Sequence, residues 1–62
     1  MEKILVRVTR PDLTTYEMVY TNVIIRKDET GINIYVNNCN SMLAGFYPIG
    51  WALEVVKVEI IE

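Results

Sequence analysis

The stretch TGINIYVNNCNSMLAGFYPIGWAL, residues 30–53, runs for 24 positions without a Lys, Arg, Asp or Glu, in a chain with six basic and eight acidic residues. Its second half, residues 42–53, carries the only Phe, the only Trp and one of the four Tyr. Aromatic side chains dominate the energetics of cores and interfaces, because each removes a large apolar area from water. We therefore expect this stretch both to close the hydrophobic core and to meet a partner.

The length of 62 residues predicts a single small domain over residues 1–62, because no second core could be assembled from what the first leaves. A domain of this size buries only about 60% of the surface of its unfolded chain. Small scaffolds commonly add disulfides, a bound metal or oligomerisation. One cysteine, Cys39, excludes an intrachain disulfide, and without His there is no ordinary zinc ligand set. Oligomerisation remains, and the 52% of hydrophobic residues favours it.

Charge and hydropathy restrict the partners and the compartment. The net charge is −2, and the basic residues are not clustered, so nothing steers the chain toward phosphate backbones. The first apolar run, residues 4–6, is too short for a signal peptide. The apolar segment 42–53 is shorter than the roughly 20 residues that span a bilayer, and glycines and a proline interrupt it. We expect a soluble, cytoplasmic protein.

The first half of the chain has the alternation of half-buried strands. In residues 3–10, Ile4, Val6 and Val8 share one face, and the proline that follows ends the strand. Residues 14–26 are rich in β-branched and aromatic types and predict a long strand, with a bulge or sharp bend near Thr21 and Asn22 where the apolar face changes. The alternative for residues 14–26 is a helix capped by Asp12.

The second half predicts a hairpin and two further strands. A charged turn at 27–31 leads into a strand over 31–37, and a polar loop over 37–41 follows. We predict a short strand at 45–47, a turn or single helical turn at 49–53, and a last strand over 54–61. In that last strand the expected inward residues are Val56, Val58 and Ile60. The expected outward residues are Val55, Lys57, Glu59 and Ile61.

Together these segments predict an all-β fold, a small antiparallel meander of four or five strands or an open SH3-like barrel. Short connections favour strands that are neighbours in space, which supports the sequential order. The comparison with SH3-like barrels concerns architecture alone and implies no function.

Catalysis is the least favoured class of function. The chain has no His for general acid–base chemistry, and Cys39 has none to activate it. Asp28 and Glu29 are adjacent on a predicted turn, where side chains point apart and are solvated. No phosphate-binding glycine loop and no metal-ligand spacing occurs. We therefore expect no enzyme, no cofactor and no metal.

Binding of single-stranded nucleic acid or of a nucleotide is the alternative function. Small barrels stack bases on aromatic side chains, and the four Tyr, the Phe and the Trp could provide such platforms. Four basic residues could contact phosphates, but acidic residues lie beside them and weaken the field. These basic residues are Arg7, Arg10, Arg26 and Lys27.

Protein binding is the function that the sequence favours. We expect a non-enzymatic interaction module that self-associates and that acts as an adaptor or inhibitor of a larger protein. The residue types enriched at interface cores gather in the uncharged stretch, and exposed apolar residues on the last strand add to them. The expected interface residues are Met42, Phe46, Tyr47, Trp51, Val55 and Ile61. The same aromatic residues could instead fill the core.

Overall fold

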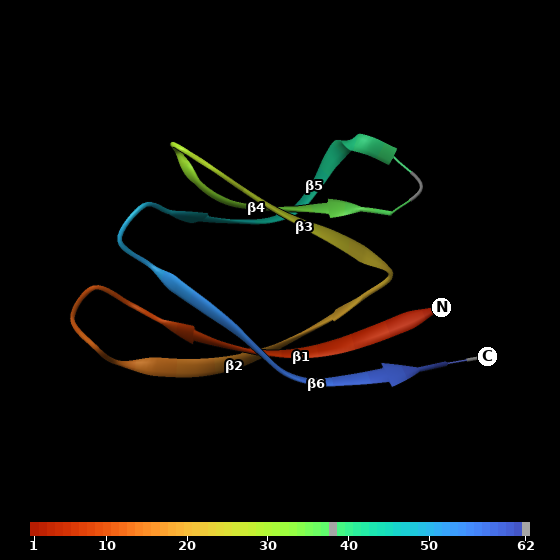
Figure 1. Ribbon diagram of the computed structural model, residues 1–62, viewed down its shortest axis with the longest axis horizontal. Helices are drawn as coiled ribbons and strands as arrows, with labels where there is room; N and C mark the ends of the chain where they lie inside the picture. The colour runs from red at the N-terminus through yellow and green to blue at the C-terminus, as the bar shows by residue number, and fades with distance from the viewer. Residues whose placement is uncertain (38, 62) are drawn as a thin grey trace.

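The computed structural model describes residues 1–37 and 39–61, with the backbone alone for residues 39–41, and these residues form six strands and no helix. The strands are β1 (Glu2–Thr9), β2 (Thr15–Thr21), β3 (Val23–Asp28), β4 (Gly31–Val36), β5 (Cys39–Pro48) and β6 (Ala52–Ile60). They make two three-stranded antiparallel sheets, ordered β2-β1-β6 and β3-β4-β5, which lie one over the other (Figure 1). The predicted all-β class is confirmed.

The predicted count of four or five strands is wrong, because the segment 14–26 makes two strands rather than one. Asn22, at the predicted bend, has a left-handed φ of 56°, which asparagine tolerates better than most residues. Its backbone N–H donates to the carbonyl of Glu2, 2.6 Å away, and its own carbonyl accepts from the N–H of Asn37 at 3.0 Å. The chain thereby passes from the first sheet into the second. The bend is confirmed, and the helical alternative for this segment is wrong.

The two sheets are not a single meander, because β6 returns to pair with β1. They are not a closed barrel either, because the strands pair only within each of the two separate sheets. The strand predicted at 45–47 is the end of the longer β5, which begins at Cys39 and takes up most of the predicted loop 37–41; residue 38 of that loop lies outside the described residues. A tight turn replaces the helical turn considered for 49–53. In this turn Gly50 has a φ of 97°, and the N–H of Trp51 donates to the carbonyl of Pro48.

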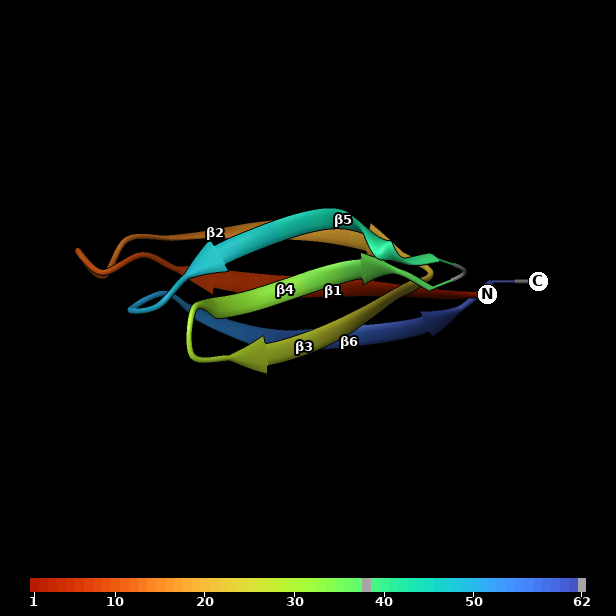
Figure 2. The same ribbon diagram turned by 90° about the horizontal axis from the view of Figure 1, so that it is seen from above.

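The core lies between the two central strands, β1 and β4, which overlie each other when the molecule is seen from above (Figure 2). The inward alternation predicted for β1 is confirmed, since Ile4, Val6 and Val8 are buried. The core residues are Ile4, Val6, Val8, Tyr20, Ile32, Ile34 and Tyr47. Val6, Val8 and Ile34 have no exposed surface. These side chains come from both sheets, so the core holds the two layers together.

Strand β6 differs from the prediction in what it buries. Val56, Val58 and Ile60, predicted inward, are 43%, 53% and 69% exposed. Val58 does lie opposite the buried Ile4, and so it faces the core side, but the other sheet leaves this part of the edge strand exposed. The register shifts between Leu5 and Val6, as in a β-bulge, and this shift places Val55 opposite Val6 on the core side rather than outward as predicted.

The predicted hairpin is confirmed as β3 and β4, joined by a tight turn in which Asp28 faces Gly31. One carboxylate oxygen of Asp28 accepts hydrogen bonds from the backbone N–H of Thr30 at 2.8 Å and from its hydroxyl at 2.6 Å. Gly31 has a φ of 142°, and a Cβ there would collide with the carbonyl oxygen of Tyr47. Glycine is therefore required where the hairpin passes β5.

In the part of the chain that the structure describes, no helix is long and apolar enough to cross a membrane.

Candidate interaction surface

The two long sides of the sandwich differ in how the sheets meet. Strands β2 and β5 run along one side, which we call the closed side, and β3 and β6 run along the other, the open side (Figure 2). On the closed side the hydroxyl oxygens of Tyr20 and Tyr47 are 2.5 Å apart. Gly45 lies so close that a Cβ at this position would be 2.6 Å from the Tyr20 hydroxyl. The sheets are therefore in tight contact on this side.

On the open side the sheets leave a cleft of about 300 Å³, which we call the open-side cleft. Seven residues from β3, β4, the β5–β6 turn and β6 line it: Ile25, Lys27, Ile32, Trp51, Ala52, Leu53 and Val55. Six of them are apolar, and Lys27 is the one charged residue among them. A cleft of this composition suits apolar side chains of a partner.

Trp51 lies where the core meets the open-side cleft. It is half-buried, and its ring centroid is 6.0 Å from that of Tyr47, with the two planes tilted by 39°. The guanidinium carbon of Arg10 is 6.0 Å from the centroid of the Trp51 ring and 4.4 Å from that of Tyr16. Arg10 thus bridges two aromatic rings, and cation–π attraction of this kind favours a fixed position for Trp51.

The structure brings together two of the six residues predicted for the interface. Trp51 and Val55 line the same cleft. Tyr47 is buried in the core, and Phe46, its neighbour on β5, pairs with Asn33 and points to the opposite face of the sheet. Met42 and Phe46 are exposed on β5, away from the cleft lining, and Ile61 is half-buried just beyond β6.

The interface predicted from the sequence took Val55 and Ile61 from the last strand, but it did not include the exposed residues between them on the free edge of β6. Every residue from Glu54 to Ile60 is exposed, and this edge combines apolar residues with both signs of charge. Arg7 of β1 donates to the carboxylate of Glu54 at 3.1 Å, and the Lys57 ammonium lies 3.7 Å from the carboxylate of Glu59. The alternation of Val, Lys, Val, Glu and Ile in residues 56–60 is visible in the sequence. That this strand lies at the edge of its sheet depends on the order of the strands, which the sequence does not show.

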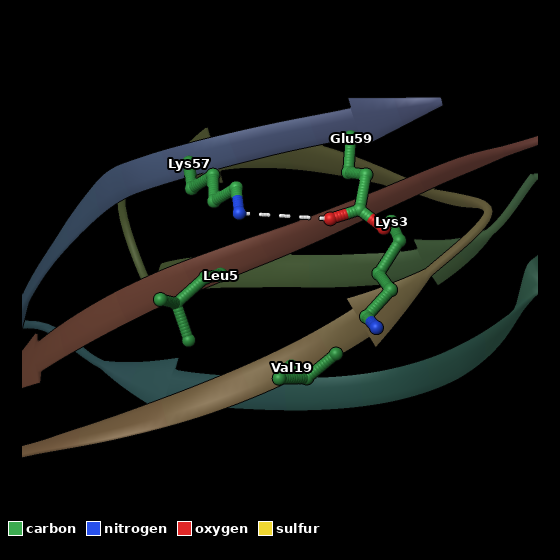
Figure 3. Close-up of a pocket in the computed structure, with 5 residues that line it drawn as sticks. All are labelled: Lys3, Leu5, Val19, Lys57 and Glu59. Carbon is green, nitrogen blue, oxygen red and sulfur yellow. Dashed lines mark ion pairs between the residues drawn. The ribbon is translucent and has the colours of Figure 1, made fainter. Parts of the chain in front are cut away.

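A second, smaller hollow of about 170 Å³ lies on the outer face of the first sheet. Figure 3 shows its lining: Lys3 and Leu5 from β1, Val19 from β2, and Lys57 and Glu59 from β6. Lys57 and Glu59 both extend from β6, and the Lys57 ammonium points toward the Glu59 carboxylate, whereas Leu5 lies on β1 and Val19 on β2 (Figure 3). This ion pair joins two exposed residues of β6, so the hollow adjoins the edge strand.

The carboxylates of Asp12 and Asp28 accept hydrogen bonds from residues of their own turns. Hydrogen bonds from the side chain and backbone of Thr14 lower the pKa of Asp12, and those from Thr30 lower the pKa of Asp28. Asp28 also accepts from the amide of Asn33 at 3.0 Å, so its oxygens are occupied within the hairpin. Among the residues described, no three His, Cys, Asp or Glu side chains are grouped as metal ligands would be. The Cys39 side chain lies outside the described part.

Comparison of the chain with models of protein families, with curated proteins and with solved structures finds no match.

Proposed function

We propose that this chain is a non-enzymatic protein-interaction module that binds a second copy of itself through its open side. The observation that carries the proposal is the distribution of apolar side chains. Among the described residues, twelve large hydrophobic side chains are exposed and seven hydrophobic residues are buried. The accessible surface of 4406 Å² also exceeds the roughly 4100 Å² that surface-to-mass scaling gives for a monomer of 7.2 kDa.

Four of the twelve exposed apolar residues lie on one strand, β6. Val55, Val56, Val58 and Ile60 follow one another along β6, and the open-side cleft adjoins them at Val55. A contiguous apolar patch next to a cleft is typical of an interaction site, whereas single exposed hydrophobic residues are ordinary. This continuity supports the open side as the binding surface.

A second copy is the partner that this surface fits best. β6 is the outermost strand of its sheet, and an edge strand offers backbone groups that an identical strand can complete. Self-association would also offset the small core of a chain that cannot form an intrachain disulfide. A role as an adaptor or inhibitor of a larger protein, in the cytoplasm, belongs to the same proposal, and the single cysteine is compatible with a reducing compartment.

Sedimentation equilibrium tests the proposal, with Val55→Lys and Val19→Lys as matched variants. The two valines are almost equally exposed, 47% and 49%, but Val55 lies in the open-side cleft and Val19 on the outer face of the first sheet. The wild type should sediment with the mass of at least two chains at micromolar concentration. Val55→Lys should dissociate it, because a buried unpaired charge is costly, and Val19→Lys should not. A folded wild type that is monomeric throughout would contradict the proposal.

A further inference from the structure

We propose that the two copies join by antiparallel pairing of β6 with β6, about a two-fold axis that passes beside Val58. This inference rests on the proposed self-association and specifies its geometry. The result would be one continuous sheet of six strands, in the order β2-β1-β6-β6-β1-β2. Three observations lead to it: the free backbone edge of β6, the order of its charges, and the face on which its apolar residues lie.

The first observation is the direction of the backbone groups. The N–H of Ile61 donates to the carbonyl of Met1, 2.7 Å away, so Ile61 directs its backbone toward β1. Successive residues in a strand direct their N–H and C=O groups to alternate sides. Val58, three residues before Ile61, and Ile60, one before it, therefore direct theirs to the free edge. These are the groups that an antiparallel partner strand needs.

The second observation is the order of charges. When two identical antiparallel strands pair about an axis beside Val58, Val58 faces Val58 of the second copy, and Lys57 of each copy faces Glu59 of the other. Val56 then faces Ile60. Axes one residue away oppose Lys57 to Lys57 or Glu59 to Glu59, and like charges in direct opposition are destabilising. Charges on an edge strand usually prevent pairing, but alternating signs make this edge complementary to itself.

The third observation is the distribution of side chains between the two faces. Val58 lies opposite Ile4, so it shares the core side of the sheet, whereas Lys57 lies opposite Leu5 on the outer face. Pairing would gather the uncovered apolar residues of both copies on the core side. On the outer face it would place two Lys57–Glu59 pairs side by side, so that each ammonium has a carboxylate in its own chain, 3.7 Å away, and one across the interface.

The decisive experiment uses Lys57→Glu and Glu59→Lys, separately and mixed one to one. Either variant alone opposes like charges at both symmetric contacts, and its dimer should weaken by about tenfold or more. In the mixture, a chain with Glu at 57 and 59 meets a chain with Lys at both, so every opposed pair is attractive. The mixture should regain the wild-type mass in sedimentation velocity. In each variant the residues at 57 and 59 of the same chain carry like charges. Attraction between these two residues within one chain therefore cannot explain a rescue by the mixture.

Crosslinking provides an independent measurement that does not depend on the charge variants. Opposed residues in hydrogen-bonded antiparallel pairs have Cα atoms about 5.5 Å apart, within the range that a disulfide spans. Val58→Cys in a Cys39→Ser background should therefore form an intermolecular disulfide under mild oxidation, and Val19→Cys in the same background should not. Circular dichroism should show the same fold for the charge variants, since the side chains at 57 and 59 are 67% and 52% exposed.

The outcomes separate this geometry from the proposed function. If the wild type is dimeric and Val55→Lys dissociates it, but the mixture shows no rescue and Val58→Cys gives no crosslink, the chain self-associates in another way and the β6 pairing is wrong. A wild type that stays monomeric would contradict both the proposed self-association and the β6 pairing. Rescue by the mixture together with the Val58→Cys crosslink supports the pairing.

Discussion

The hydroxyl oxygens of Tyr20 and Tyr47 lie 2.5 Å apart, so a hydrogen bond joins β2 of one sheet to β5 of the other. Both tyrosines belong to the buried core, where a hydroxyl without a partner is costly. This bond closes one side of the sandwich and leaves the opposite side, between β3 and β6, as the open one.

Removal of both hydroxyls should destabilise the fold by less than the sum of the two single removals. Tyr20→Phe or Tyr47→Phe leaves one buried hydroxyl without its partner, and the free energy of unfolding should fall by about 1–3 kcal/mol. The double variant should lose less than the sum, because neither hydroxyl is then left alone. Urea unfolding at a fixed protein concentration measures the free energy of unfolding of the wild type, the two single variants and the double variant. Additive losses would show that the two hydroxyls do not interact.

Gly45→Ala should destabilise the protein by an amount that depends on Tyr20. A Cβ at position 45 would be 2.6 Å from the Tyr20 hydroxyl and 3.3 Å from the ring carbon that bears it. The substitution should therefore lower the unfolding free energy by about 1–3 kcal/mol, as overpacking does. In a Tyr20→Phe background, where the oxygen is absent, the loss should be smaller. Equal losses in the two backgrounds would argue against this close contact.

Alkaline pH should weaken the fold through Tyr47. Burial, and then the hydrogen bond with Tyr20, raise the pKa of Tyr47 well above its ordinary value of 10.0. The unfolded chain releases this proton near the ordinary pKa while the folded chain keeps it, so the stabilisation is complete below about pH 10 and declines as the pH rises above it. Urea midpoints between pH 8 and 11 measure the decline. Tyr47→Phe should flatten it, and an unchanged slope in that variant would assign the effect to other groups.

Single-stranded DNA or RNA should not bind in the micromolar range at physiological salt. Arg7 donates to Glu54 at 3.1 Å, and Arg10 lies over the Tyr16 ring, so these two cations already have partners within the chain. Too few basic groups remain to release counterions from a phosphate backbone. Fluorescence anisotropy of labelled oligonucleotides measures this. Saturable binding that weakens steeply with added salt would favour the nucleic-acid alternative.

The parts of the fold that follow from local chemistry were predictable. The alternation in β1 requires one buried face, and Asp28 with Gly31 predicts a tight turn. The bend near Asn22 was visible because the apolar face changes there. These features depend on neighbours in sequence, which composition and periodicity report directly.

The features that sequence reasoning missed depend on residues far apart in the chain. The exposure of β6 could not be predicted. Val58 and Ile60 alternate with charged residues as in a strand with one buried face, and they are exposed only because no strand of the other sheet covers them. The register shift opposite Leu5 and Val6 likewise has no signal within β6. Phe46 and Tyr47 separate into surface and core because successive residues of β5 point to opposite faces, and the sequence alone does not show which of these faces is covered by the other sheet.

The melting temperature as a function of protein concentration tests the central claim, self-association through the open side, most directly. Association with a folded partner stabilises the folded state by mass action, so the midpoint of the wild type should rise by roughly 5–10 °C over a hundredfold increase in concentration. Val55→Lys should melt at a temperature that does not depend on concentration, and Val19→Lys should follow the wild type. A wild-type midpoint that stays constant over the same range, and equals that of a folded Val55→Lys, would contradict the account.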